Sequence, residues 1–165
     1  MCPENFAVKA MMRKTLESRE IFFYCDYHGH SRLKNSFMYG CSNIKSDRFK
    51  ERIFPLLFHK NTENFSFNNC NFVVQKAREA TARVVMWKEF SLINSFTLEC
   101  SFCGPTNGLY KDCHFTTSLL KDIGKLFCYT LRDYTNNDVK VREVLLELEI
   151  LFPPPKPEDS IFDKD

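Results

Sequence analysis

The chain has 165 residues, of which 44% are hydrophobic and seventeen are phenylalanine. This length and composition suit one ordinary domain with a substantial core and exclude an intrinsically disordered protein. The formal net charge of +2 gives no bulk attraction to nucleic acid, and no apolar run approaches the roughly 18 residues that a membrane span needs. We therefore expect neither a nucleic-acid partner nor a membrane partner.

Eight cysteines raise the question of disulfide bonds. The amino-terminal sequence MCPENFAVK lacks the continuous apolar stretch of a secretory signal. Several cysteines also lie inside apolar runs, where a free cysteine behaves as a small hydrophobic residue. We therefore expect free thiols in a reducing compartment, and a soluble, cytoplasmic protein.

The amino-terminal part predicts an α-helix followed by a strand. Residues 5–18 place apolar side chains on one side at helical spacing, so we expect this stripe to pack on the core. The stripe consists of Ala7, Val8, Met11, Met12 and Leu16. Residues 21–25 are apolar and aromatic, which is typical of a strand that is buried on both faces.

The middle of the chain predicts a short helix, a polar connector and a second strand. Asp47 is a suitable N-cap, and the helix that it begins is expected to end at Pro55, because proline lacks the backbone N–H that a helix needs. Residues 59–69 are polar and rich in asparagine, so His59 within them is expected on the surface. Residues 70–75 predict a short strand.

The last third predicts one amphipathic strand and two helices. Residues 93–102 alternate between small polar and mostly apolar side chains, as in a strand with one apolar face. A long amphipathic helix is expected from Thr116 or Thr117 to Tyr134. A further helix is expected over 138–151.

Chemically active side chains follow the strand at 21–25. Asp26, His28, His30 and Ser31 come directly after it, and ligands in open α/β sheets gather just past the carboxyl ends of strands. If the extended geometry continues, His28 and His30 point to the same side. Two such imidazoles indicate metal binding or acid–base chemistry. The alternative is a histidine that caps a loop.

Glu99 is the second candidate, because the alternation at 93–102 places it among small polar groups on one strand face. It either lines a site or is an ion-paired structural glutamate. Cys100 and Cys103 form a Cys-x-x-Cys pair, a spacing found in zinc and redox sites. There is no second such pair, and Cys100 falls on the apolar strand face, so we expect no metal or redox function there.

Three blocks, YCDYHGHSRLKNSFMYGC, KAREATARVVMW and NSFTLECSFCG, occur in this order. Together they resemble the cytosolic carboxypeptidases, the M14-type zinc peptidases that trim glutamates from tubulin. The resemblance runs from about Cys2 to about Tyr134 and covers the second half of that family's catalytic domain. It implies a mixed α/β sheet with helices on both faces, the C-terminal half of a zinc-carboxypeptidase-like domain. That partial domain is expected over 1–151, with a proline-rich, acidic, disordered tail over 152–165.

The resemblance also implies roles for individual residues. The family binds one zinc ion with a His-x-x-Glu pair and a later histidine at the end of a strand, in the place of His28. His30 is the less favoured ligand. The family's catalytic glutamate corresponds to Glu99, which would accept a proton from water and pass it to the leaving amine. Its preference for acidic substrates makes Arg83 the candidate for binding a substrate carboxylate. The weaker candidates are Arg32, Lys76 and Arg78.

One departure from the family pattern limits these expectations. No His-x-x-Glu occurs in the chain, because the residues three places after its histidines are Ser31, Leu33, Thr62 and Thr117. Two of the three protein ligands to zinc are therefore missing, and we do not expect the chain alone to hydrolyse peptides efficiently. The implied substrates are glutamate-rich C-termini such as those of tubulin, and the implied location is the cytosol, with association with microtubules as a further expectation. The alternative is an inactive, truncated paralogue that acts as a binding module or has no function.

Overall fold

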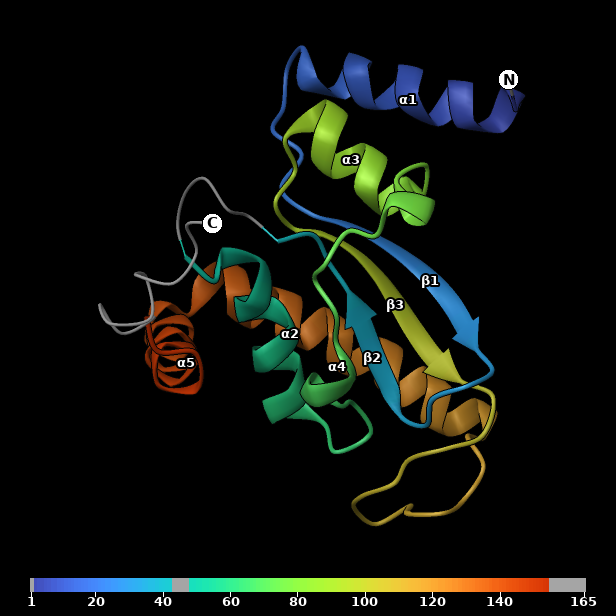
Figure 1. Cartoon of the computed structure of the whole chain (residues 1–165), viewed down its shortest axis with the longest axis vertical. Helices are drawn as coiled ribbons and strands as arrows, with labels where there is room; N and C mark the ends of the chain where they lie inside the picture. Colours follow the sequence, from blue (N-terminus) through green and yellow to red (C-terminus); the bar gives the residue numbers. More distant parts are fainter. Residues whose placement is uncertain (1, 43–47, 155–165) are drawn as a thin grey trace, which may run out of the picture.

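The computed structural model describes residues 2–42 and 48–154 (Figure 1). This part of the chain forms a three-stranded sheet with five α-helices and two 3-10 helices. In chain order the elements are α1 (Pro3–Leu16), β1 (Tyr24–His30), β2 (Ser36–Tyr39), α2 (Lys50–Asn61), η1 (Phe67–Asn69), η2 (Lys76–Arg78), α3 (Ala82–Phe90), β3 (Ser95–Ser101), α4 (Thr117–Asn136) and α5 (Asp138–Leu151).

The sheet is mixed, with the strand order β1-β3-β2. β3 is the central strand, and it pairs in parallel with β1 and antiparallel with β2. In this register His28 lies opposite Glu99, and Phe37 lies opposite Glu99 on the other side. Two residues far apart in the sequence, His28 and Glu99, are therefore neighbours across the sheet.

Helices cover both faces of the sheet, as expected. Figure 1 shows α2, α4 and α5 together beside one face, and α1 and α3 stacked near the start of β1. α3 contacts β1 and β3 on the opposite face, where the hydroxyl of Ser95 donates a hydrogen bond to the carbonyl oxygen of Arg83. The expected mixed α/β class is confirmed.

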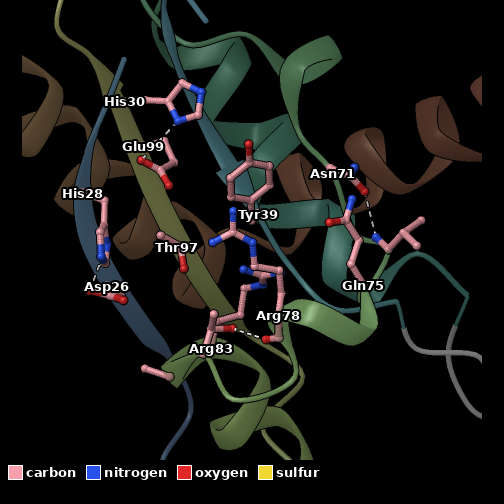
Figure 2. Close-up of a pocket in the computed structure, with 13 residues that line it drawn as sticks. Asp26, His28, His30, Tyr39, Asn71, Gln75, Arg78, Arg83, Thr97 and Glu99 are labelled. Atoms are coloured by element: carbon pink, nitrogen blue, oxygen red, sulfur yellow. Dashed lines mark hydrogen bonds and ion pairs between the residues drawn. The ribbon is translucent and has the colours of Figure 1, made fainter. Parts of the chain in front are cut away.

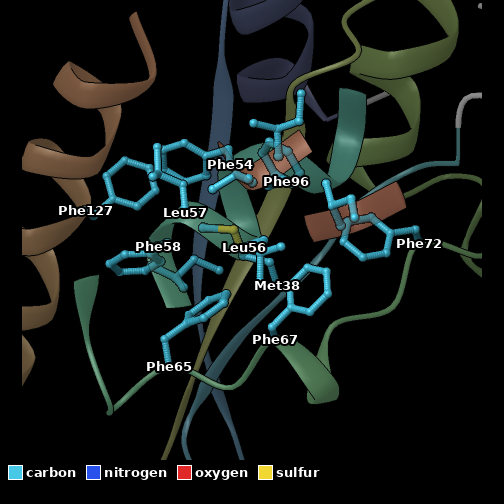
Figure 3. Packing of buried hydrophobic residues seen from close by; sticks show 14 of the residues in the cluster. Met38, Phe54, Leu56, Leu57, Phe58, Phe65, Phe67, Phe72, Phe96 and Phe127 are labelled. Atoms are coloured by element: carbon cyan, nitrogen blue, oxygen red, sulfur yellow. The ribbon is translucent and has the colours of Figure 1, made fainter. Parts of the chain in front are cut away.

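The core between the sheet and α2 and α4 is mainly aromatic (Figure 3). Phe54 of α2 is fully buried, and its ring centroid lies 4.6 Å from that of Phe23 and 5.2 Å from that of Phe127. Phe96 and Leu98 of β3 reach the same cluster from the sheet. Each of these side chains stabilises the fold by roughly 1.5–3 kcal/mol through burial. Many of the chain's phenylalanines thus serve one core.

The strand expected at 21–25 is placed wrongly. β1 begins at Tyr24 and continues to His30, so Asp26 and both histidines lie within the strand and not past its end. The strand is also not buried on both faces, since its side chains are half-buried or exposed. The aromatic residues before it, such as Phe22, lie outside the sheet.

The expected end of the second helix at Pro55 is wrong. α2 continues through Pro55 to Asn61, and the stretch from Ile53 to Phe58 is buried. A proline inside a helix costs about 3 kcal/mol, because it removes one hydrogen bond and its ring clashes with the carbonyl of the residue four places earlier. Burying the consecutive apolar residues around Pro55 contributes more than this cost. The expected N-cap, Asp47, lies outside the described residues.

Two further expectations need correction. Of the apolar stripe on α1 only Met12 is buried, against Met86 and Leu92, while Met11 is 61% exposed. The strand expected at 70–75 is reduced to a single bridge between Asn71 and Tyr39. The N–H groups of Gly40 and Ser42 donate to the carbonyl oxygens of Asn71 and Phe72, but no regular strand pairing forms beyond this bridge.

The other elements agree with the sequence. The strand expected at 93–102, the two long helices and the surface position of His59 are confirmed, and Thr116 caps α4 by accepting a hydrogen bond from the N–H of Leu119. All eight cysteines have free thiols. Of the helices in the described ranges, none combines the length and apolar character of a membrane-spanning segment. Most of the expected tail over 152–165 lies outside the described residues.

Candidate functional site

A cleft of about 560 Å³ lies on the sheet face opposite the aromatic core (Figure 2). Strands β1, β2 and β3 form the floor of the cleft, and the segment from 71 to 83 forms its wall. The lining residues are Asp26, His28, His30, Tyr39, Asn71, Val73, Gln75, Arg78, Thr81, Ala82, Arg83, Thr97 and Glu99. The cleft therefore contains all three residues that the sequence singled out for function.

Strand alternation explains why polar side chains collect here. Asp26, His28 and His30 are two residues apart on β1, so they share one face. Thr97 and Glu99 do the same on β3. The expectation that the two histidines point to the same side is confirmed.

His28 pairs with Asp26 on its own strand. Its Nδ1 lies 3.2 Å from Oδ1 of Asp26, and its side chain is 53% exposed. A carboxylate that accepts a hydrogen bond from Nδ1 fixes the tautomer in which Nε2 has a free lone pair. His28 is therefore accessible, and the carboxylate of Asp26 lies close enough to its Nδ1 to favour this tautomer.

Glu99 is the buried carboxylate of the cleft, with 9% of the residue exposed. Within the part of the chain that the structure describes, its Oε2 has no hydrogen-bond partner. Burial raises the pKa of Glu99 above the usual value for glutamate, and the neighbouring His30, His28 and Arg83 oppose this effect. A carboxylate whose pKa is raised toward neutral pH suits proton transfer better than an ordinary one.

His30 occupies a different environment from His28. Its side chain is 19% exposed, and its Nδ1 lies 3.7 Å from Oε2 of Glu99, just beyond hydrogen-bond distance. Its ring packs edge-on against Phe37, with 4.9 Å between the centroids. His30 is therefore held beside the buried carboxylate, and the more exposed His28 faces the open part of the cleft.

Arg83 stands at the start of α3 and is only 7% exposed. Its Nε donates a 3.0 Å hydrogen bond to the carbonyl oxygen of Gly40, and its guanidinium carbon lies 5.5 Å from the ring centroid of Tyr39. These contacts fix a cation in the wall of the cleft. Arg78 also lines the cleft, and Arg32 and Lys76 do not.

The metal-binding side chains of the cleft can supply one ligand of a zinc site, but not a complete site. Among the described residues, no group of three or more histidine, cysteine, aspartate or glutamate side chains is placed to bind one metal ion. Cys100 and Cys103 do not add ligands for a metal ion. Burial of Cys100 raises the pKa of its thiol to about 11, which keeps it protonated at neutral pH, and Cys103 is exposed.

Sequence reasoning did not single out several residues of the cleft. Thr97 could have been found, since it lies two residues before Glu99 on the same strand face. Asp26 was expected among the chemically active side chains that follow the strand, but it was assigned no role of its own. Tyr39 and Gln75 carried no local signal, because their position depends on the folding of the 71–83 segment over the sheet.

Comparison with known proteins supports the resemblance. No family model matches the chain. It is 48% identical to cytosolic carboxypeptidase 2 of Mus musculus over 146 residues, which are 87% of this chain and 17% of that protein. It is 46% identical to cytosolic carboxypeptidase 3 of Bos taurus over 154 residues, or 89% of this chain and 15% of that protein. The chain therefore spans about a sixth of the length of these relatives.

Solved structures show a similar fold. A metallo-carboxypeptidase from Burkholderia cenocepacia superposes with a TM-score of 0.58 and 15% sequence identity, over 76% of this chain and 33% of that one. A putative carboxypeptidase from Burkholderia mallei gives a TM-score of 0.59 over 80% of this chain and 34% of that one. At this identity the likeness concerns the fold, and it extends over about a third of each bacterial chain.

Proposed function

Because the chain belongs to the cytosolic carboxypeptidase family, we propose that its cleft is one part of an active site that removes C-terminal glutamates from acidic proteins. The observation that carries this proposal is the meeting of three separated residues in one cleft. His28, Arg83 and Glu99 come from different elements and line the same cavity. A buried carboxylate, an accessible imidazole and a fixed guanidinium are the groups that such a reaction requires.

Glu99 is proposed as the proton-transfer group. Its buried Oε2, which has no hydrogen-bond partner among the described residues, is free to accept a proton from the attacking water. The same carboxyl group then returns the proton to the leaving amine when the peptide bond breaks. The neighbouring imidazole of His30 restricts the space around the carboxylate, since it lies 3.7 Å from Oε2 of Glu99 and its ring packs against Phe37.

Arg83 is proposed as the group that selects acidic substrates. A guanidinium binds a carboxylate through two parallel hydrogen bonds, and Arg83 is held in place by Gly40 and by the ring of Tyr39. Arg78 adds a second positive charge to the same wall. Glutamate-rich C-termini in the cytosol, such as those of tubulin, are the proposed substrates.

His28 is proposed as one ligand of a zinc ion. The described residues do not supply the other ligands, so the proposed site requires further ligands from outside the described residues. The same observation favours a second candidate function, in which the chain is a module that binds acidic tails and does not cleave them.

A chimera separates the two functions. In mouse cytosolic carboxypeptidase 2, the 146 matched residues are replaced by the corresponding part of this chain. The proposal predicts release of glutamate from a peptide that ends in several glutamates, and a fall in kcat of about 100- to 10,000-fold for Glu99→Gln. Glu143→Gln, on the exposed surface of α5, is the control. A soluble chimera that binds the peptide and releases no glutamate would support the binding module.

A further inference from the structure

Two arginines in the wall of the cleft have no carboxylate partner in the described ranges. Arg78 and Arg83 both line the cleft, and no ion pair joins either guanidinium to a described acidic side chain. Glu79, the acidic residue next to Arg78, pairs instead with Lys88 over 3.5 Å. The wall therefore carries two positive charges that no described side chain neutralises, and such charges in a concave site attract anions.

The two arginines differ in burial and in how they are held. Arg83 is 7% exposed, and its guanidinium is fixed by the carbonyl oxygen of Gly40 and the ring of Tyr39. Arg78 is exposed and belongs to the 3-10 helix η2. The wall thus offers one cation in its buried part and one cation at its exposed rim, so the two can bind different groups of the same ligand.

The backbone beneath Arg78 is anchored although its side chain is exposed. The N–H of Arg78 donates a 2.8 Å hydrogen bond to the carbonyl oxygen of Gln75. Its own carbonyl oxygen accepts a 2.8 Å hydrogen bond from the hydroxyl of Thr81 (Figure 2). A long side chain on a fixed base can follow a ligand over a short range without leaving the cleft, which suits a group that binds at the rim.

The hydroxyl of Tyr39 connects the two cations with the buried carboxylate. Burial raises the pKa of Tyr39 above its usual value, the charge of Glu99 adds to this effect, and Arg78 and Arg83 oppose it. Both arginines and Glu99 therefore act on one hydroxyl group that lines the cleft. The four side chains surround a common space, so a ligand beside Glu99 can reach both cations.

We propose that Arg78 binds a second carboxylate of the substrate, the side chain of the glutamate next to the C-terminal one. This inference rests on the proposed function for the class of substrate. The terminal side chain enters deepest and meets the buried Arg83, while the preceding residue stays at the rim beside Arg78. A guanidinium binds a carboxylate through two parallel hydrogen bonds. The cleft then prefers tails with consecutive glutamates to tails with a single terminal glutamate.

Two peptides test the proposal without reference to cleavage. One ends in Glu-Glu and the other in Ala-Glu, and calorimetry measures the affinity of each for the 165-residue chain. The wild type should bind the Glu-Glu peptide more tightly. Arg78→Gln should weaken binding of that peptide about three- to tenfold, and binding of the Ala-Glu peptide less than about twofold. A loss confined to the Glu-Glu peptide identifies the neighbouring side chain as the ligand of Arg78.

The chain offers a matched control on the same short helix. Lys76→Gln makes the same change of charge in η2, but Lys76 does not line the cleft, so this variant should bind both peptides as the wild type does. Arg78→Lys keeps the charge and loses the planar guanidinium, and it should recover part of the preference for Glu-Glu. Because Arg78 is exposed, each variant should unfold at the same temperature as the wild type.

Three results would overturn the proposal. The first is an equal effect of Arg78→Gln on the two peptides, including no effect on either. The second is an absence of binding to the chain, because both arginines are already in place there. The third is an effect of Arg78→Gln that disappears when the C-terminus of the Glu-Glu peptide is amidated, since the ligand would then be the main-chain carboxylate.

Arg83→Gln tests the proposed function separately, because it should weaken binding of both peptides. If it weakens neither, while Arg78→Gln still separates the two peptides, Arg83 loses its proposed role and the second binding point remains.

Discussion

The two faces of the sheet contrast in what their side chains do. On one face, Phe96 and Leu98 of β3 are buried against α2 and α4 in an aromatic core. On the other face, Thr97 and Glu99 of the same strand line an open polar cleft. Adjacent residues of one strand thus belong to a region that stabilises the fold and to a region that carries chemistry. The contrast predicts that substitutions on the two faces have different effects.

The largest effect on stability is expected in the aromatic core. Phe54→Ala removes a fully buried ring that contacts Phe23, Phe58, Phe96 and Phe127. We expect a loss of about 3–5 kcal/mol in the free energy of unfolding, measured by denaturant titration.

The matched control for this core variant is Leu109→Ala. Leu109 is 85% exposed, so its truncation should change stability by less than about 0.5 kcal/mol. Similar losses for the two variants would show that the aromatic cluster is not the main core.

The next largest effect concerns binding in the cleft. Arg83→Gln removes the fixed cation, and we expect about 10- to 100-fold weaker binding of a peptide with C-terminal glutamates, because charge-assisted hydrogen bonds contribute about 1.5–3 kcal/mol. Calorimetry with the isolated chain measures this. Arg142→Gln, exposed on α5, has the same charge change and should bind normally. Equal affinities would remove Arg83 from the site.

Glu99 should make the stability depend on pH. Burial raises its pKa in the folded state, so the folded chain binds this proton more tightly than the unfolded chain does. The resulting stabilisation is present at low pH and is lost as the pH rises through the folded pKa.

Glu99→Gln cannot ionise, and at neutral pH it should be more stable than the wild type by about 1 kcal/mol, or about two to four degrees in the unfolding midpoint. The difference should shrink toward pH ~4, where Glu99 is protonated. Thermal unfolding over this pH range measures it. A difference that grows as the pH falls would contradict the assigned direction of the pKa shift.

The smallest effect on stability is expected at His28. Its side chain is 53% exposed and forms one ion pair with Asp26, so His28→Ala should change the free energy of unfolding by less than about 1 kcal/mol. A large loss measured by denaturant titration would make His28 a structural residue and weaken the contrast between the faces.

The sequence predicted the fold class and the site better than it predicted the borders of the elements. The alternation of β3 and the periodicity of α4 and α5 are local patterns, and they placed Glu99 correctly on its strand face. Pro55 within α2 and the exposed Met11 on α1 were mispredicted, because both depend on tertiary contacts.

The prediction of the cleft was limited in the same way, because part of the cleft depends on tertiary contacts. His28 and Glu99 were candidates from local patterns, Arg83 was identified through the family resemblance, and the structure brings the three together. The wall formed by Asn71, Gln75 and Arg78 depends on how the 71–83 segment crosses the sheet, which no local pattern encodes.

The most direct test of the account is the zinc content after exhaustive dialysis. We expect almost no zinc in the isolated 165-residue chain, about one ion per molecule in the chimera with mouse cytosolic carboxypeptidase 2, and loss of that ion in the chimera with His28→Ala. One tightly held zinc per isolated chain would contradict the account, because the chain would then contain a complete site. Retention of zinc by the His28→Ala chimera would contradict the assignment of His28 as a ligand.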